Sequence, residues 1–165
     1  MISEVFTSSL ESLPKHDWQD YPYIEGVIKH ASFEIDGVTY KVEFAPMHVC
    51  LDNLVKSRIY NSECDGYIES GVEVAFFATG LRTGAYGRTG RYQLIPIMNM
   101  VVKAILEYIK EYRPTFIEFQ PNDEKLDKLY RLMGKKLVNS TSDYKPYSID
   151  SRHHIYVVGE YESVE

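Results

Sequence analysis

Cysteine is scarce in this sequence, which has only Cys50 and Cys64 among its 165 residues. Two thiols close at most one disulfide, so the fold cannot rest on a disulfide framework, and we expect a reduced intracellular setting. No apolar run is long enough to cross a membrane, and the polar N-terminus does not resemble a targeting segment. The sequence therefore predicts a soluble, cytoplasmic protein without a membrane partner.

An excess of positive charge is also lacking, because the net charge is −6 and the pI is near 5.4. A chain of this charge has no broad electrostatic footprint for DNA or RNA. The five histidines do not form a metal motif. His48 and Cys50 are two residues apart, Cys64 is distant, and His153 and His154 should point to opposite faces of a strand. We expect no metal site and no general nucleic-acid binding.

The length of the chain predicts a single domain that is large enough to bury a hydrophobic core. Its centre is a strand over 71–78, a glycine-rich loop, and a helix from Pro96 to Tyr112. The strand is a short apolar run, and the helix has apolar residues at three- and four-residue steps. Pro96 suits a first helical turn, where the missing N–H costs nothing.

The loop between this strand and this helix combines small residues with cations. Its sequence is TGLRTGAYGRTGRYQ, and it contains Gly84, Gly87, Gly90, Arg82, Arg88 and Arg91. Free N–H groups at a helix N-terminus attract anions, and arginine pairs well with phosphate oxygens. The pattern favours a phosphate site, and the alternative is a plain surface loop.

The segments before this unit predict a covering segment and a hairpin. Residues 1–25 are expected to cover the sheet, with a short helix or turn between Pro14 and Pro22. Residues 27–45 alternate in character around Asp36-Gly37, which is typical of a hairpin with a type I′ turn. Pro46 is expected to end the second strand, and 47–66 to form a long loop or a short helix.

The segments after it predict a further strand at 115–120, parallel to the 71–78 strand because a helix crosses between them. A second helix should follow Pro121-Asn122, with an apolar stripe that includes Tyr130. Residues 138–152 are expected to be a surface excursion, and 153–158 a final strand. This order predicts an α/β fold with a mixed sheet.

Three stretches resemble the GNAT superfamily of acyl-CoA N-acyltransferases. Val72 to Thr79 looks like the family's fourth strand, and Glu73 stands where histone-type members carry a glutamate base. The glycine and arginine loop is similar to the loop that binds the cofactor pyrophosphate. Leu129-Tyr130 followed by Gly134 resembles the next family helix, whose tyrosine often lies near the cofactor thiol. The likeness covers roughly residues 27–137, and KLYRLMGKKL is also similar to GNAT-like proteins carried by bacteriophages.

The resemblance implies a single GNAT-like domain that transfers an acetyl group from acetyl-CoA to an amine on a small molecule or a protein. It implies Glu73 as the base and Tyr130 as the proton donor to the leaving thiolate. The residues that it implies for cofactor binding are Phe77, Ala78, Thr79, Arg82, Gly84, Gly87, Arg88 and Gly90.

A second hypothesis is a catalytically silent GNAT-fold protein that binds a partner. The loop matches the family's Arg/Gln-x-x-Gly-x-Gly/Ala pattern in no register, since Ala85 replaces the first glycine when the motif begins at Arg82. Fourteen tyrosines suit a partner surface as well as a core. Such a protein would act on a host or virion protein in the host cytoplasm if it is phage-encoded, or form a homo-oligomer. In this hypothesis Glu73 is a solvated strand residue and Tyr130 a core residue.

Overall fold

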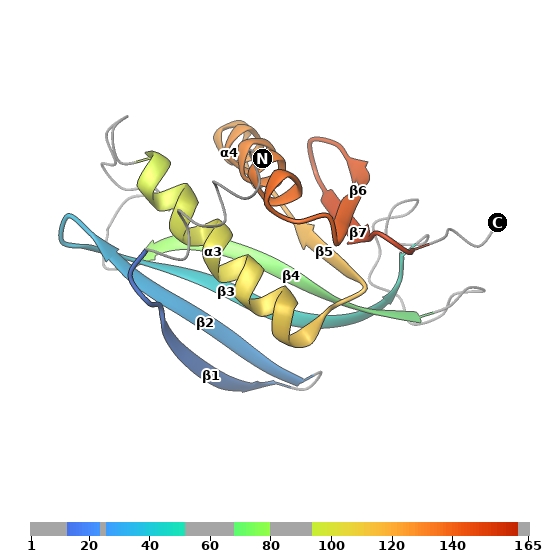
Figure 1. Ribbon diagram of the computed structural model, residues 1–165, viewed down its shortest axis with the longest axis horizontal. Coiled ribbons are helices and arrows are strands. Elements are labelled where there is room, and N and C mark those ends of the chain that lie inside the picture. The colour runs from blue at the N-terminus through green and yellow to red at the C-terminus, as the bar shows by residue number, and fades with distance from the viewer. Residues whose placement is uncertain (1–12, 24–25, 52–67, 80–93, 162–165) are drawn as a thin grey trace.

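The computed structural model describes residues 13–23, 26–51, 68–79 and 94–161, which form a seven-stranded mixed sheet and two helices. The strands are β1 (Asp17–Tyr23), β2 (Gly26–Ile35), β3 (Val38–Cys50), β4 (Ile68–Thr79), β5 (Phe116–Phe119), β6 (Tyr144–Ile149) and β7 (His154–Val158). The helices are α3 (Leu94–Tyr112) and α4 (Glu124–Ser140). The strand order is β1-β2-β3-β4-β5-β7-β6 (Figure 1). The predicted α/β fold with a mixed sheet is confirmed.

The β2–β3 hairpin turns at Asp36-Gly37, as predicted. Both residues have positive φ, 51° for Asp36 and 79° for Gly37, which is the backbone that a type I′ turn requires. The two strands pair antiparallel from Ile35 and Val38 outward, and β3 then pairs antiparallel with β4 along its whole length.

The helix α3 connects two parallel strands that lie side by side. The register of β4 and β5 joins Gly71 to Phe116 and Glu73 to Glu118. Gly71 allows this close approach, because a Cβ at that position would lie 2.3 Å from the Phe116 ring. The predicted parallel pair with its crossover helix is therefore present. Glycine is required at position 71 because any side chain there would overlap the Phe116 ring.

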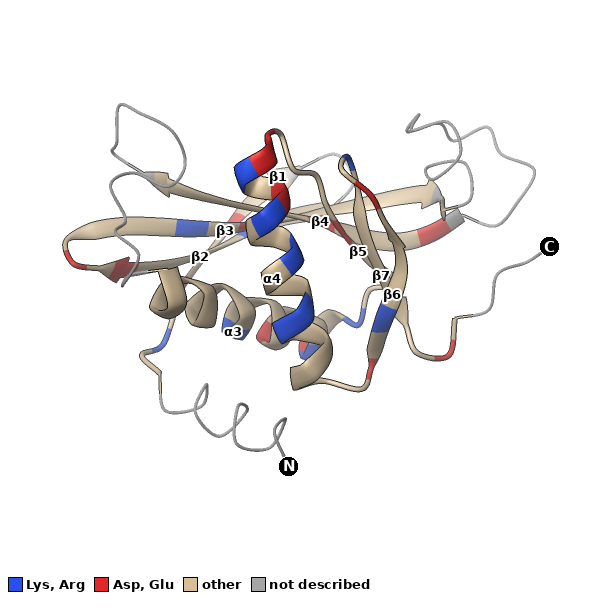
Figure 2. Ribbon diagram, turned by 90° about the horizontal axis from the view of Figure 1, so that it is seen from above, with Lys and Arg blue, Asp and Glu red and all other residues tan. Residues whose placement is uncertain are grey.

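Both helices pack on one face of the sheet. Seen edge-on to the strands, α3 lies on one side of them (Figure 2). Its buried residues and those of α4 share one core with the even-numbered residues of β3 and β4, such as Phe44 and Val74. Phe44 stacks on Tyr108 of α3, with ring centroids 4.4 Å apart. Neither of these described helices is long and apolar enough to cross a membrane.

The two helices end differently. Arg113 follows α3 with φ of 42° and donates its N–H to the Ile109 carbonyl at 2.9 Å, and Pro114 prevents continuation. Asp123 caps α4 by accepting the Leu126 N–H at 2.7 Å. The helix α4 extends to Ser140, so the predicted surface excursion at 138–152 is wrong at its start.

Three predicted boundaries are wrong because strands continue through prolines. β3 runs through Pro46 to Cys50, beyond the point where β2 stops pairing with it at Phe44. β1 and β6 contain Pro22 and Pro146, where the sequence predicted a covering segment and a surface excursion. Both are the outermost strands of the sheet, and a proline is tolerated there because one side of an edge strand forms no ladder hydrogen bonds.

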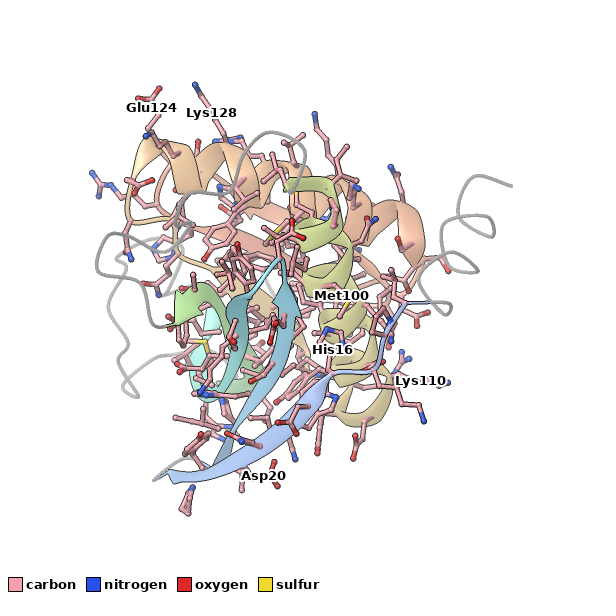
Figure 3. The ribbon with its side chains drawn as sticks, turned by 90° about the vertical axis from the view of Figure 1, so that its left-hand side faces the viewer. His16, Asp20, Met100, Lys110, Glu124 and Lys128 are labelled. Atoms are coloured by element: carbon pink, nitrogen blue, oxygen red, sulfur yellow. The ribbon has the colours of Figure 1, made fainter. Side chains whose placement is uncertain are left out.

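The segment before β1 is fastened to α3. Lys103 is buried in the middle of α3, and its Nζ donates to the carbonyls of Leu13 at 3.2 Å and Pro14 at 2.8 Å. The buried His16 lies against Met100 (Figure 3), and its Nε2 is 2.8 Å from the Met100 carbonyl oxygen. A carbonyl only accepts, so Nε2 carries the proton. In the predicted covering segment, residues 13–16 thus pack against α3. The predicted short helix or turn between Pro14 and Pro22 is wrong, because Asp17–Tyr23 form β1, and residues 1–12 lie outside the described residues.

We expect Gly71→Ala to destabilise the fold by about 1–3 kcal/mol, because the new methyl group overlaps the Phe116 ring and cannot be accommodated without moving β5. Urea unfolding measures the free energy of unfolding. Gly159→Ala is the matched control, since a Cβ there meets only ordinary contacts of 3.4 Å and longer, and it should stay within about 0.5 kcal/mol of the wild type. A Gly71→Ala variant as stable as the wild type would contradict this packing.

His16 should make stability depend on pH. Burial lowers the pKa of His16 below its usual 6.5, while the hydrogen bond to Met100 and the charge of Glu107 oppose this shift and Lys103 adds to it. The unfolded chain therefore binds the proton more readily than the folded protein. The contribution of His16 to the free energy of unfolding is complete above about pH 6.5, and it is lost as the pH falls toward the folded pKa. Urea unfolding at pH 7.5 and pH 5 measures this loss. His16→Gln keeps a donor for Met100 and should show a smaller loss, and equal losses in the two proteins would refute the assignment.

Candidate functional site

The strands β4 and β5 separate directly after a very short ladder. Pairing covers only Gly71 to Glu73 on β4, and β5 ends one residue later at Phe119 while β4 continues to Thr79. Figure 1 shows β5 turning away from β4 beyond this point. The carboxyl ends of parallel strands are where ligands gather in α/β sheets. This separation is the centre of the candidate site.

Glu73 stands on β4 at the last pair before the separation, opposite Glu118 of β5. Its side chain is half-buried and shares the face of Gly71, which is the face away from the two helices and is called the open face below. A second apolar cluster, which includes Phe116 and Ile155, also packs on this face. Burial raises the pKa of Glu73, and the neighbouring carboxylates Glu118 and Glu43 raise it further. A carboxyl group with a raised pKa is better able to accept and hold a proton.

Tyr130 of α4 enters the same region from the helix side. It is 3% exposed, and its ring packs on Phe119 with centroids 5.2 Å apart. Burial raises the pKa of Tyr130 to about 12, and the charge of Glu73 adds to the rise. A backbone hydrogen bond with Phe76 of β4 opposes it, which identifies the Phe76 N–H as the donor and the phenolic oxygen as the acceptor. Tyr130 is therefore a neutral phenol at pH 7.

Glu73 and Tyr130 lie on opposite sides of the sheet. Side chains alternate between the faces of a strand, and Val72, Val74 and Phe76 of β4 belong to the helix-side core. Glu73 therefore points to the open face, whereas Tyr130 packs within the helix-side core. The two groups still interact electrostatically.

The predicted cofactor residues divide into two groups. Phe77 lies on the open face, edge-on to the His30 ring at 6.2 Å, and Ala78 packs against the helix-side core. Thr79 pairs with Thr39 at the end of β4. The others, Arg82, Gly84, Gly87, Arg88 and Gly90, lie outside the described residues, as does Arg91. The first turn of α3, which follows them in sequence, contains no acidic residue.

Sequence reasoning missed the side chains that flank Glu73. On one side Glu118 is fully buried, and its Oε1 lies 3.2 Å from Nδ1 of His153. On the other side Glu43 of β3 lies 2.9 Å from Nε2 of His30. The available signal was a glutamate between apolar residues in the buried stretch 116–119, since such a charge requires a partner.

His153 and His154 point to opposite faces, as predicted. His154 is buried on the helix side, where its Nε2 is 2.7 Å from Asp127 of α4. Asp127 also accepts from Arg131 at 3.0 Å. Nearby, Gly134 has a steric role, because a Cβ there would overlap the Tyr156 hydroxyl. Within the described part of the chain, no three His, Cys, Asp or Glu side chains are arranged to hold a metal ion.

The sequence matches no protein-family model, and it matches no curated protein.

Proposed function

We propose that this protein is a GNAT-like N-acyltransferase that transfers an acetyl group from acetyl-CoA to an amine. One observation carries the proposal. Two parallel strands, joined by a crossover helix, separate immediately beyond Glu73, and the Tyr130 hydroxyl is hydrogen-bonded to the backbone of Phe76, three residues farther along β4. The resemblance of 72–79 and of the Tyr130 helix to this superfamily supports the proposal, as does the sequence of the arginine loop.

In the proposed reaction, Glu73 takes a proton from the acceptor ammonium, directly or through water. The freed amine attacks the thioester carbonyl carbon, a new C–N bond forms, the C–S bond breaks, and the second proton lost by the nitrogen passes to the leaving thiolate to give the free thiol. The leaving thiolate, with a thiol pKa near 8.5, needs little help, and a phenol with a pKa of about 12 assists it mainly as a hydrogen-bond donor. Holding the amine against the thioester supplies most of the acceleration.

Acetyl-CoA would place its phosphates at the loop before α3. The sequence of this loop supplies arginines and glycines, which suit phosphate binding, and the first turn of α3, which follows it in the sequence, contains no acidic residue. The acetyl end would then lie at the separation of β4 and β5. This arrangement requires the cofactor to run along the end of β4 past Ala78 and Thr79.

The second candidate is a silent GNAT-fold binding protein, and the burial of Tyr130 favours it. Tyr130 is 3% exposed, packs on Phe119 and is hydrogen-bonded to the Phe76 backbone. These contacts explain a tyrosine in the core without any catalytic role. Its partner would be a host or virion protein if the chain is phage-encoded. Binding of coenzyme A and release of thiol distinguish the two candidates.

Calorimetry with coenzyme A should give measurable binding heat. Replacing Arg82 or Arg88 with Ala should weaken binding by about 1.5–3 kcal/mol for each charged hydrogen bond removed, which is roughly 10- to 100-fold. The melting temperature should hardly change. Arg152→Ala, at an exposed arginine before β7, is the matched control and should bind like the wild type. Unaltered affinity in the Arg82 and Arg88 variants would place the phosphate site elsewhere.

Glu73→Gln should slow thiol release from acetyl-CoA by about 100-fold or more at neutral pH, since a positioned base contributes on this scale. The loss should be largest at low pH and shrink as the pH rises, because the amine then loses its proton without help. A panel of amines and peptides supplies the acceptor. Glu111→Gln makes the same charge change on an exposed position of α3 and should keep full activity. A loss that does not vary with pH would remove Glu73 from the role of base.

Tyr130→Phe should lower turnover with little change in coenzyme A affinity. It also leaves the Phe76 N–H without its acceptor, so we expect a loss of about 1–3 kcal/mol in the free energy of unfolding. Turnover is measured well below the melting temperature, which separates the two effects. If a folded variant keeps wild-type turnover, the hydroxyl has a packing role alone.

A further inference from the structure

A row of titratable side chains crosses the open face of the sheet at Glu73. The register places Glu73 opposite Glu118 on one side and opposite Ala45 on the other, with Glu43 two residues from Ala45. Neighbouring strands are about 4.8 Å apart. Glu118 therefore lies directly beside Glu73, and Glu43 lies diagonally across from it on the other neighbouring strand. Like charges placed side by side in a sheet are destabilising. The repulsion between these carboxylates must therefore be offset by neighbouring hydrogen-bond donors or positive charges.

The compensation at the β5 end is an imidazole. Glu118 is 0% exposed, and its Oε1 accepts from both Nδ1 of His153 and Nε2 of Gln120. A carboxylate only accepts, so Nδ1 of His153 carries a proton toward it. Asp150 fixes the backbone of this histidine by accepting the His153 N–H at 2.9 Å. The pair is thus held firmly, one strand away from Glu73.

The compensation at the β3 end is similar but more exposed. His30 of β2 lies 2.9 Å from Glu43, and the imidazole also contacts the rings of Tyr21 and Phe77. Glu73 stands between these two pairs. In the part of the chain that the structure describes, no cationic side chain lies within ion-pair distance of Glu73. The middle carboxylate therefore depends on its two neighbours for its electrostatic environment.

We propose that Glu118 and His153 form a positioning pair that sets how readily Glu73 accepts a proton. This inference rests on the proposed function, in which Glu73 is the base. The negative charge of Glu118 favours a protonated Glu73, and the imidazole of His153 limits how much of that charge reaches it. The other titratable groups near Glu73 are Glu43, with His30 behind it on β2, and Tyr130 of α4, which interacts with Glu73 electrostatically from the helix side. Lys41 lies farther along β3 on the same face as Glu73.

The pair acts on a single step of the reaction. An N–H bond of the acceptor ammonium breaks, an O–H bond to Glu73 forms, and the released lone pair attacks the thioester carbon. A stronger negative charge at Glu118 makes that transfer more favourable but also keeps Glu73 protonated to a higher pH. The balance between the carboxylate and the imidazole therefore fixes the lower pH limit of activity.

The test is an NMR titration of the Glu73 carboxyl in the full chain labelled with carboxyl-¹³C glutamate, with Glu73→Gln used to assign its signal. Glu118→Gln removes the neighbouring charge and should lower the Glu73 midpoint. His153→Gln leaves that charge without its imidazole and should raise the midpoint. Glu111→Gln, on the opposite face of the sheet, should leave it unchanged. The opposite directions of the two shifts are the signature of a positioning pair, which a merely structural role would not produce.

A Glu73 midpoint that is the same in the wild type, Glu118→Gln and His153→Gln overturns the proposal. If Glu118→Gln does not fold, the direction of the His153→Gln shift decides alone. The lower limb of the pH profile for thiol release should move with the NMR midpoint, and a limb that stays in place while the midpoint moves also overturns it. Absence of thiol release in every protein would instead refute the proposed function, and the titration would still decide whether the pair governs Glu73.

Discussion

The short parallel ladder between β4 and β5 holds the two parts of the sheet together. Strands β1 to β4 form one continuous antiparallel group, β5 to β7 form another, and the register between the groups covers only three residue pairs from Gly71 to Glu73. One further backbone bond, from the Thr115 N–H to the Ser70 carbonyl at 2.8 Å, extends this junction. The absence of a side chain at Gly71 is therefore a constraint on the whole sheet, because Phe116 occupies that space.

This constraint also creates the candidate site. The strands β4 and β5 pair over three residues and then diverge, so the rest of β4 has no β5 backbone beside it. The Tyr130 hydroxyl accepts a hydrogen bond from one of the N–H groups left in this way, that of Phe76. Elsewhere the sheet separates the helix-side core from the opposite face, which carries the carboxylates and a second apolar cluster that includes Phe116 and Ile155. In the proposed reaction, the acceptor amine would approach Glu73 from the open face, and the thioester would meet it at the separation of the strands.

Local sequence signals predicted the parts of the fold that depend on local chemistry. The Asp36-Gly37 turn, the apolar stripe of α3 and the crossover between β4 and β5 each follow from backbone preference or from periodicity. The errors at Pro22, Pro46 and Pro146 have one common cause, because a proline ends a central strand but not one with an open side. Which strands lie at the edge is a property of the whole sheet, so no local pattern could supply it.

The candidate site was predictable only in part, for the same reason. Glu73 and Tyr130 could be selected from the resemblance, and periodicity correctly sent His153 and His154 to opposite faces. The pairing of Glu118 with His153 joins residues 35 positions apart and depends on the register of β5 with β7. A charge inside a four-residue buried strand indicated that some partner existed, without indicating which one.

The electrostatics of the open face bear on the choice between an enzyme and a silent scaffold. Because the folded state raises the pKa of Glu73, it holds the proton more tightly than the unfolded chain, and its stability falls as the pH rises through the unfolded value near 4.5 toward the folded one. At neutral pH a glutamine at this position would avoid that cost. A scaffold that only packs and binds gains nothing from a half-buried carboxylate between two other carboxylates. In the proposed reaction the same neighbours favour protonation of Glu73, and groups with perturbed pKa values are typical of functional sites.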